Sequence, residues 1–183
     1  MTKGRSMINP ARGNNMKAIV DLFASIDNVI ASFMKFAVTV MGIFVAFAMV
    51  IGIVARALLG IQVFGLEELV LTAAMWLYML GAALASRERS HLSADFIEAF
   101  SKNKTLPHVT RLIATGLSVV LAVFFVTWSY SLFAWGVEKG QVTPVFSIPQ
   151  YISQGSLFVA SILLLLYALR DLIHDAGKLF NKR

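Results

Sequence analysis

Four long stretches of the sequence lack charged residues, and they constrain the fold more than any other feature. They are Phe36–Ala55, Leu69–Ser86, Leu112–Val137 and Gly140–Leu169. A helix rises about 1.5 Å per residue, so about 20 apolar residues cross the ~30 Å hydrocarbon core of a bilayer. Only 14% of all residues are charged, whereas soluble domains carry about 25%. The sequence therefore predicts an all-α membrane protein with four transmembrane helices.

The expected transmembrane helices cover about residues 34–56, 66–86, 110–136 and 148–170. In the fourth stretch, Pro144 and Pro149 interrupt the apolar run. Because proline is tolerated in the first turn of a helix, we expect Ser147 to cap this helix and Pro149 to follow in its first turn. The helices form one membrane domain over 16–175, between a flexible tail at 1–15 and a second tail at 176–183.

The distribution of Lys and Arg predicts the orientation in the membrane. All but two of the 16 basic residues lie before the first span, between the second and third, or after the fourth. Only Arg56 and Lys139 lie on the other side. The positive-inside rule then places both termini in the cytoplasm. The net charge of +6 is explained by this bias and by attraction to anionic phospholipid, so no nucleic-acid partner is expected.

Two segments beside the spans have the pattern of amphipathic helices. Within 16–33, the apolar residues follow helical spacing, and after the second span Leu92, Phe96 and Phe100 recur every fourth residue. Such helices commonly lie in the membrane interface. We therefore expect one interfacial helix before span 1 and one after span 2. The alternative is that each segment simply extends the neighbouring transmembrane helix.

Small residues recur at spacings that allow membrane helices to approach closely, which predicts a compact four-helix bundle. Examples are Gly42 with Ala46, Ala48 with Gly52, Gly81 with Ala85, and Ser156 with Ala160. Trp76 and Tyr78 lie near the middle of the second span, where their N–H and O–H groups need partners. They either pack inside the bundle or, with Gly81, form an interface with another membrane protein.

The remaining residues exclude several kinds of chemistry. The chain has no cysteine, so it forms no disulfide, thiolate zinc site or thiol redox centre. Its three histidines lie outside the spans, where they could not hold a haem inside the helices, and no ionisable residue lies at mid-membrane. We therefore expect no catalytic residue, no metal and no cofactor on this chain. The alternatives are an anchor subunit of a quinone- or haem-linked enzyme complex and a small oligomeric exporter.

The densest polar cluster follows span 2 and reads RERSHLSAD at residues 87–95. In a helix, Glu88, His91 and Asp95 would share one face and could resemble a metal site. Zinc sites usually assemble more nitrogen or sulfur ligands, however, and Arg87 and Arg89 would oppose a cation. We interpret the cluster as a hinge and a marker of topology.

A second group of charges flanks the turn between spans 1 and 2. Arg56 ends the first span, and Glu67 and Glu68 open the second. Opposite charges attract more strongly at a membrane boundary than in bulk water. We expect a salt bridge between Arg56 and this pair of glutamates that fixes the hairpin.

These motifs resemble the small membrane subunit, DctQ-like, of tripartite ATP-independent periplasmic (TRAP) transporters. The resemblance covers about residues 20–175. Its motifs begin with Arg56, Glu68-Leu69, Trp76-Leu77 and Gly81-Ala82-Ala83, continue with Arg87, His91 and Asp95, and end with Thr143-Pro144 and Ile148-Pro149.

The resemblance implies a non-catalytic subunit in the bacterial inner membrane. Its partners would be a large multi-span subunit on a separate polypeptide and a periplasmic protein that delivers an organic acid, such as a dicarboxylate or sialic acid. Sodium ions would bind the large subunit, which moves like an elevator. The small subunit would widen the static scaffold.

Overall fold

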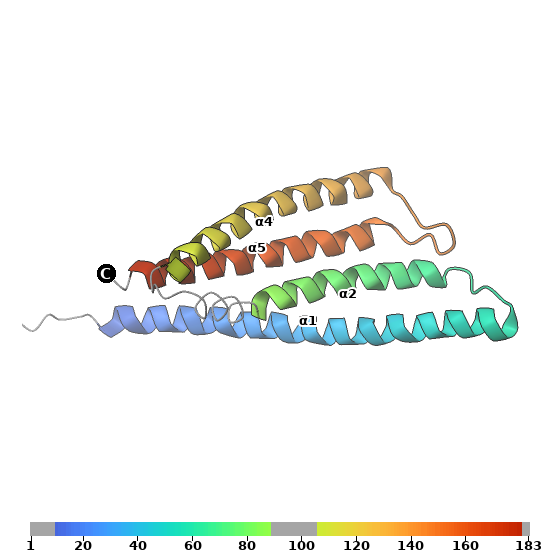
Figure 1. Ribbon diagram of the computed structural model, residues 1–183, viewed down its shortest axis with the longest axis horizontal. Helices are drawn as coiled ribbons and strands as arrows, with labels where there is room; N and C mark the ends of the chain where they lie inside the picture. The colour runs from blue at the N-terminus through green and yellow to red at the C-terminus, as the bar shows by residue number, and fades with distance from the viewer. Residues whose placement is uncertain (1–9, 89–105, 181–183) are drawn as a thin grey trace, which may run out of the picture.

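Four helices make up the part of the chain that the computed structural model describes, residues 10–88 and 106–180. They are α1 (Pro10–Leu59), α2 (Leu66–Glu88), α4 (Leu106–Lys139) and α5 (Tyr151–Phe180) (Figure 1). Each contains a segment long and apolar enough to cross a membrane. The prediction of an all-α protein with four membrane-length helices is confirmed. The second expected surface helix lies outside the described residues.

The first helix differs from the expectation of an interfacial segment that turns into span 1. α1 runs for 50 residues from Pro10 to Leu59 without a break, a length of about 75 Å. Since no proline follows Pro10 within the helix, nothing in the sequence forces the backbone to turn. The segment 16–33 is therefore a straight extension of the transmembrane helix, which is the alternative interpretation of its sequence.

The helices lie side by side in a row, in the order α1, α2, α5, α4 (Figure 1). α1 packs on α2, α2 on α5, and α5 on α4. No Cα pair within 8 Å joins α1 to α4 or α5, or α2 to α4, among the described residues. The prediction of a compact bundle was wrong. Small residues at Gly81 and Gly116 face open space and not another helix, and lipid provides no hydrophobic force that would close the row.

Between α1 and α2, small residues do allow close packing. Gly42 lies opposite Leu77 and Gly52 opposite Leu66, whose Cδ2 would be only 3.0 Å from a Cβ at position 52. Ala48 and Ala55 are buried on the same side of α1. The opposite side of α1 exposes large apolar side chains, among them Phe33, Phe36, Val40, Ile43, Phe47, Val54 and Leu58.

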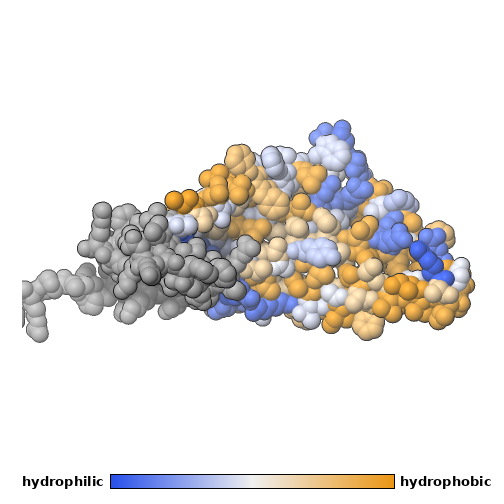
Figure 2. All heavy atoms as spheres, in the orientation of Figure 1, coloured by the Kyte–Doolittle hydropathy of each residue, from blue (hydrophilic) through white to orange (hydrophobic). Residues whose placement is uncertain are grey.

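Exposed apolar surface dominates the molecule. Hydrophobic side chains cover most of the described helices on the face in Figure 2, and hydrophilic ones gather toward the ends. Soluble monomers rarely expose apolar patches larger than a few hundred Å². Such a surface is stable when lipid tails or another membrane protein cover it.

The end of α1 agrees with the capping rules, whereas the start of α5 differs from the expected cap. Gly60 follows α1 with φ +64°, the left-handed conformation in which helices commonly end, and the Ile61 N–H donates to the Ala55 carbonyl over 3.3 Å. α5 begins later than expected, at Tyr151, so Pro149 lies before the helix and not in its first turn. Ser147 is not the N-cap either: it has φ +52° in the preceding loop, where Val142 and Pro149 form an isolated bridge.

Candidate functional site: the seam between two hairpins

The row consists of two hairpins, α1–α2 and α4–α5, joined where α2 packs on α5. We call this α2–α5 contact the seam. We call the end with the connections 60–65 and 140–150 the loop end. The opposite end is the charged end, and its charged residues include Asp27, Arg87, Arg111, Arg170, Asp171 and Asp175.

At the loop end, Glu68 clamps the α4–α5 connection onto the start of α2. Its carboxylate accepts hydrogen bonds from the backbone N–H groups of Val145 at 2.8 Å and Phe146 at 3.0 Å. The Thr143 hydroxyl accepts from the Ile148 N–H at 2.9 Å and is a hydrogen-bonding neighbour of the carboxylate. One acidic side chain therefore holds a loop that follows it by more than seventy residues.

Arg56 does not take part in this clamp. Its Nη2 lies 3.8 Å from Glu67 Oε1, and both side chains are mostly exposed. The predicted salt bridge across the first hairpin is present, but it uses Glu67, whereas Glu68 points to the second hairpin. Because exposed ion pairs contribute little to stability, the Arg56 pair is the weaker of the two contacts.

The Phe146 ring lies over Gly65, immediately before α2. Gly65 has φ +82°, and a Cβ there would overlap the Phe146 ring. We predict that Gly65→Ala lowers the free energy of unfolding by at least about 1–2 kcal/mol, because the left-handed backbone disfavours a side chain and the ring must also move. Thermal unfolding in mild detergent measures the loss.

Gly60→Ala is the matched control for this substitution. Gly60 has φ +64°, but a Cβ at this position would meet nothing within 4 Å, so it should show the backbone cost alone. Equal losses in the two variants would show that the Phe146 contact contributes nothing.

Along the middle of the seam, side chains of α2 bind the first turn of α5. The Trp76 Nε1–H donates to the Ile152 carbonyl at 3.1 Å, and the Ser153 hydroxyl donates to Thr72 Oγ1 at 3.3 Å. The Trp76 N–H is therefore satisfied within the chain, which agrees with the first of the two interpretations of this residue.

Tyr78 and Gly81 lie on the other side of α2. Tyr78 is 67% exposed, and its hydroxyl makes no hydrogen bond to another residue of the described ranges. A Cβ at Gly81 would meet nothing within 4 Å. Ala82 and Ala85 are exposed on the same face. We call Tyr78, Gly81, Ala82 and Ala85 the open face of α2.

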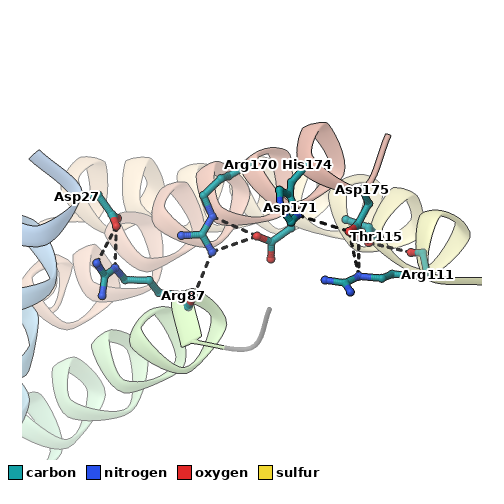
Figure 3. Close-up of polar contacts among 8 residues, drawn as sticks. All are labelled: Asp27, Arg87, Arg111, Thr115, Arg170, Asp171, His174 and Asp175. Atoms are coloured by element: carbon teal, nitrogen blue, oxygen red, sulfur yellow. Dashed lines mark hydrogen bonds and ion pairs between the residues drawn. The ribbon is translucent and has the colours of Figure 1, made fainter. Parts of the chain in front are cut away.

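At the charged end, Arg87 joins α2 to α1 (Figure 3). Its Nε and Nη2 lie 2.9 Å and 2.8 Å from Asp27 Oδ2, and Nη2 also donates to Asn28 Oδ1 at 2.8 Å. The Arg170 Nη2 of α5 donates to the Arg87 carbonyl at 3.1 Å. A cation at this position satisfies a carbonyl in the last turn of α2 and complements the helix dipole.

A buried tyrosine lies beneath these charges. Tyr167 is 6% exposed and packs with Ala31, Met34, Leu80 and Ala83, so side chains of three helices meet at this point. The Arg170 guanidinium lies over its ring, 5.2 Å from the centroid. This cluster and the Arg87 contacts fix the first hairpin to α5.

The second hairpin is closed by Asp175 of α5, whose side chain is 5% exposed. Its carboxylate accepts from Arg111 Nε at 3.1 Å and from the Thr115 hydroxyl at 3.0 Å (Figure 3). No sequence motif singled out Asp27, Arg111 or Asp175 as site residues. The sequence feature that could have indicated these contacts is the presence of acidic residues among the basic ones at the ends of the spans.

Deeper between α4 and α5, two buried serines meet. Ser129 Oγ and Ser161 Oγ are 2.8 Å apart, and each also lies near a carbonyl of its own helix. We predict that Ser161→Ala lowers the free energy of unfolding by about 0.6 kcal/mol, the average for such bonds between membrane helices. Denaturation in mixed micelles measures the change. Ser118→Ala, whose hydroxyl bonds only within α4, should be neutral, and an equal loss there would contradict the assignment.

The RERSHLSAD cluster at residues 87–95 is only partly described. Glu88 Oε1 lies 3.4 Å from Lys35 Nζ, which leaves it in an ion pair with α1. His91 and Asp95 lie outside the described residues. Within those residues no group of three His, Asp or Glu side chains could hold a metal ion.

The charged contacts at the two ends of the molecule hold neighbouring helices together. Asp27 and Asp175 are paired with arginines, and Glu68 with backbone N–H groups. Such charge-assisted bonds are short and directional, so they fix which helices are neighbours and in what register. The four helices therefore form a row that is held together by polar contacts at both ends.

Comparison with known proteins assigns the chain to a family. The family model for the DctQ component of tripartite ATP-independent periplasmic transporters matches residues 45–177, from the middle of α1 to the last turns of α5. A search of curated proteins gave no match. The family match covers more than half of the chain and includes the loop-end clamp, the seam and the Arg111–Asp175 pair. The chain belongs to the family of DctQ components of tripartite ATP-independent periplasmic transporters.

Proposed function

We propose that this chain is a non-catalytic scaffold subunit of a sodium-coupled TRAP transporter in the bacterial inner membrane. It binds a separate large multi-span subunit, which carries the substrate and sodium sites and moves like an elevator. A periplasmic binding protein delivers the substrate, an organic acid such as a carboxylate. The small subunit widens the static part of the complex and binds no cofactor itself.

The observation that carries this proposal is the row of helices tied at both ends. A moving transport domain needs a static element that does not deform with it. The Glu68 clamp at one end and the Arg87 and Asp175 contacts at the other restrain the helices from shifting relative to one another. The apolar surface between them leaves broad faces for lipid and for a larger membrane protein.

The open face of α2 supports a site for that partner. Its small residues allow another helix to approach closely, and the exposed Tyr78 hydroxyl offers a hydrogen bond that lipid tails cannot accept. Tyr78 and Gly81 are therefore the proposed interface, while Trp76 supports α2 from the opposite side through Ile152.

The orientation follows from the distribution of basic residues. The charged end, with Arg87, Arg111 and Arg170, is proposed to face the cytoplasm together with both termini. The loop end, with Arg56 and Lys139, then faces the periplasm. The N-terminal part of α1, which exceeds the length needed to cross the bilayer, extends into the cytoplasmic interface.

Co-purification and reconstitution test the proposal. The tagged full-length chain should be isolated in mild detergent with one much larger membrane protein at a fixed ratio, and Gly81→Leu should weaken that association. Matched Gly116→Leu, at an equally open glycine on α4, should leave it intact. In proteoliposomes, uptake of an organic acid should require both subunits, the binding protein and a sodium gradient.

Two results would contradict the proposal and favour the alternatives. Solute uptake by the reconstituted chain alone would identify a small exporter. A Soret absorption band in the purified complex, assigned to haem held by this chain, would identify an enzyme anchor. Retention of the partner by Gly81→Leu would move the interface away from the open face of α2.

A further inference from the structure

A groove opens between α1 and α2 at the loop end. Its volume is about 630 Å³, within the range of about 300–1,000 Å³ that is usual for ligand sites. Most of its lining is apolar and includes Met49, Gly52, Ile53, Val63, Leu66, Val70 and Leu71. Three polar residues, Arg56, Gln62 and Glu67, complete it.

The groove has a polar rim and an apolar floor. Arg56 lies in the last turn of α1 and Glu67 in the first turn of α2, so both belong to the boundary of the membrane. Met49 lies two turns before Arg56 in α1, which is about 10 Å deeper in the membrane. Ile53 is 64% and Leu71 67% exposed, so the groove is open along its side to the surrounding membrane.

The rim presents one positive and one negative group that are close together but weakly joined. Arg56 Nη2 and Glu67 Oε1 are 3.8 Å apart, longer than the 2.7–3.2 Å typical of N–H···O hydrogen bonds. Within residues 10–88 and 106–180 the Arg56 guanidinium makes no hydrogen bond. Its five N–H donors are therefore available to an oxyanion, and the Glu67 carboxylate to a donor cation.

We propose that this groove binds a phospholipid with a phosphoethanolamine head group, which lies in the outer leaflet if the orientation under the proposed function holds. Arg56 binds the phosphate, Glu67 and the Gln62 side chain accept from the ammonium group, and an acyl chain fills the apolar floor toward Met49. The paired charges of the rim match the paired charges of a zwitterionic head group. An anionic head group would gain from Arg56 but be repelled by Glu67, and a choline group has no N–H to donate to the carboxylate.

Lipid titration followed by native mass spectrometry tests this site. The full-length protein is purified in mild detergent with any partner that accompanies it, and dioleoyl phosphatidylethanolamine or dioleoyl phosphatidylglycerol is added. Arg56→Gln should raise the apparent Kd for phosphatidylethanolamine about fivefold, the effect of one cationic side chain at a lipid surface. Glu67→Gln should remove the preference over phosphatidylglycerol.

Two further variants separate binding in the groove from effects on folding. Ala57→Phe adds bulk at an exposed lining position and should block binding while both rim charges remain. Lys139→Gln removes a positive charge at the loop end but outside the groove, and should bind like the wild type. Melting temperatures close to that of the wild type establish that each variant is folded.

The outcomes decide the proposal without reference to transport, which the proposed function predicts separately. Equal Kd values for wild type, Arg56→Gln and Ala57→Phe would overturn it. So would a wild-type preference for phosphatidylglycerol. A cysteine introduced at Ala57, unique because the chain has none, should be alkylated by a lipid-soluble maleimide that carries a photoreactive benzophenone. Illumination should give no cross-link to protein, and a photo-cross-link to a partner protein would identify that protein as the occupant and overturn the proposal.

Discussion

Asp175→Asn is expected to lower the free energy of unfolding by about 3 kcal/mol. The substitution removes the negative charge that pairs with Arg111 and leaves a guanidinium, 23% exposed, without its carboxylate. Breaking one side of a buried ion pair costs about 3–5 kcal/mol, and the partial exposure of Arg111 places this case at the lower end. Denaturation in mixed micelles, followed by circular dichroism, measures the loss.

Asp171→Asn provides the control on the same face of α5, one turn earlier. Asp171 pairs with its sequence neighbour Arg170, and both side chains are more exposed than Asp175. Such a pair contributes about 0–1 kcal/mol. Replacing both members of the buried pair, in Arg111→Met with Asp175→Leu, should recover much of the loss, since apolar side chains need no desolvation. Equal losses for Asp171→Asn and Asp175→Asn would contradict the assigned role of the buried pair.

Glu68→Ala is expected to produce the second large effect, a fall of several degrees in the melting temperature and a loss of partner assembly. It removes the acceptor of two backbone N–H groups and the neighbour of the Thr143 hydroxyl. Hydrogen bonds to a charged group are stronger than neutral ones, and this clamp is the contact that ties the second loop to α2. Thermal unfolding and co-purification measure the two consequences.

Glu67→Ala is the adjacent control for Glu68→Ala. It removes the same charge from the same turn of α2, and among the described residues it breaks only the exposed pair with Arg56, so the melting temperature of the lipid-free protein should hardly change. Glu68→Gln keeps one oxygen acceptor and should fall between the wild type and Glu68→Ala. If Glu67→Ala proved as damaging as Glu68→Ala, the helix dipole would explain the result better than the clamp.

The sequence predicted the helices because their cause is local. An uncharged run of about twenty residues must satisfy its own backbone hydrogen bonds in a bilayer, and a helix does so without any neighbour. Small-residue spacing also marked Gly42 and Gly52 as positions of close approach, although it did not identify α2 as the neighbouring helix. The same spacing at Gly81 misled, because a small residue permits an approach but does not specify which helix approaches.

The polar contacts were harder to predict, for a related reason. Glu67 and Glu68 are consecutive residues of α2, so their side chains point in different directions from the helix axis. Only the position of the second hairpin determines that the Glu68 carboxylate meets the Val145 N–H. Likewise, Asp175 and Arg111 come from helices whose register no local pattern fixes. The Arg56–Glu67 pair was predictable because a short turn joins the two residues.

The order of the helices in the row also has a consequence for how the protein is made. α1 with α2, and α4 with α5, are neighbours both in the chain and in space, so each hairpin can form as soon as its second helix leaves the translocation channel. The contact of α2 with α5 is the exception, and it can form only after the last helix has been synthesised. Until the loop residues Val145 and Phe146 and the start of α5 at Ile152 have been made, the Glu68 carboxylate and the Trp76 N–H lack these partners. The late joining of two finished halves thus becomes the step at which quality control can distinguish a complete subunit from a truncated one.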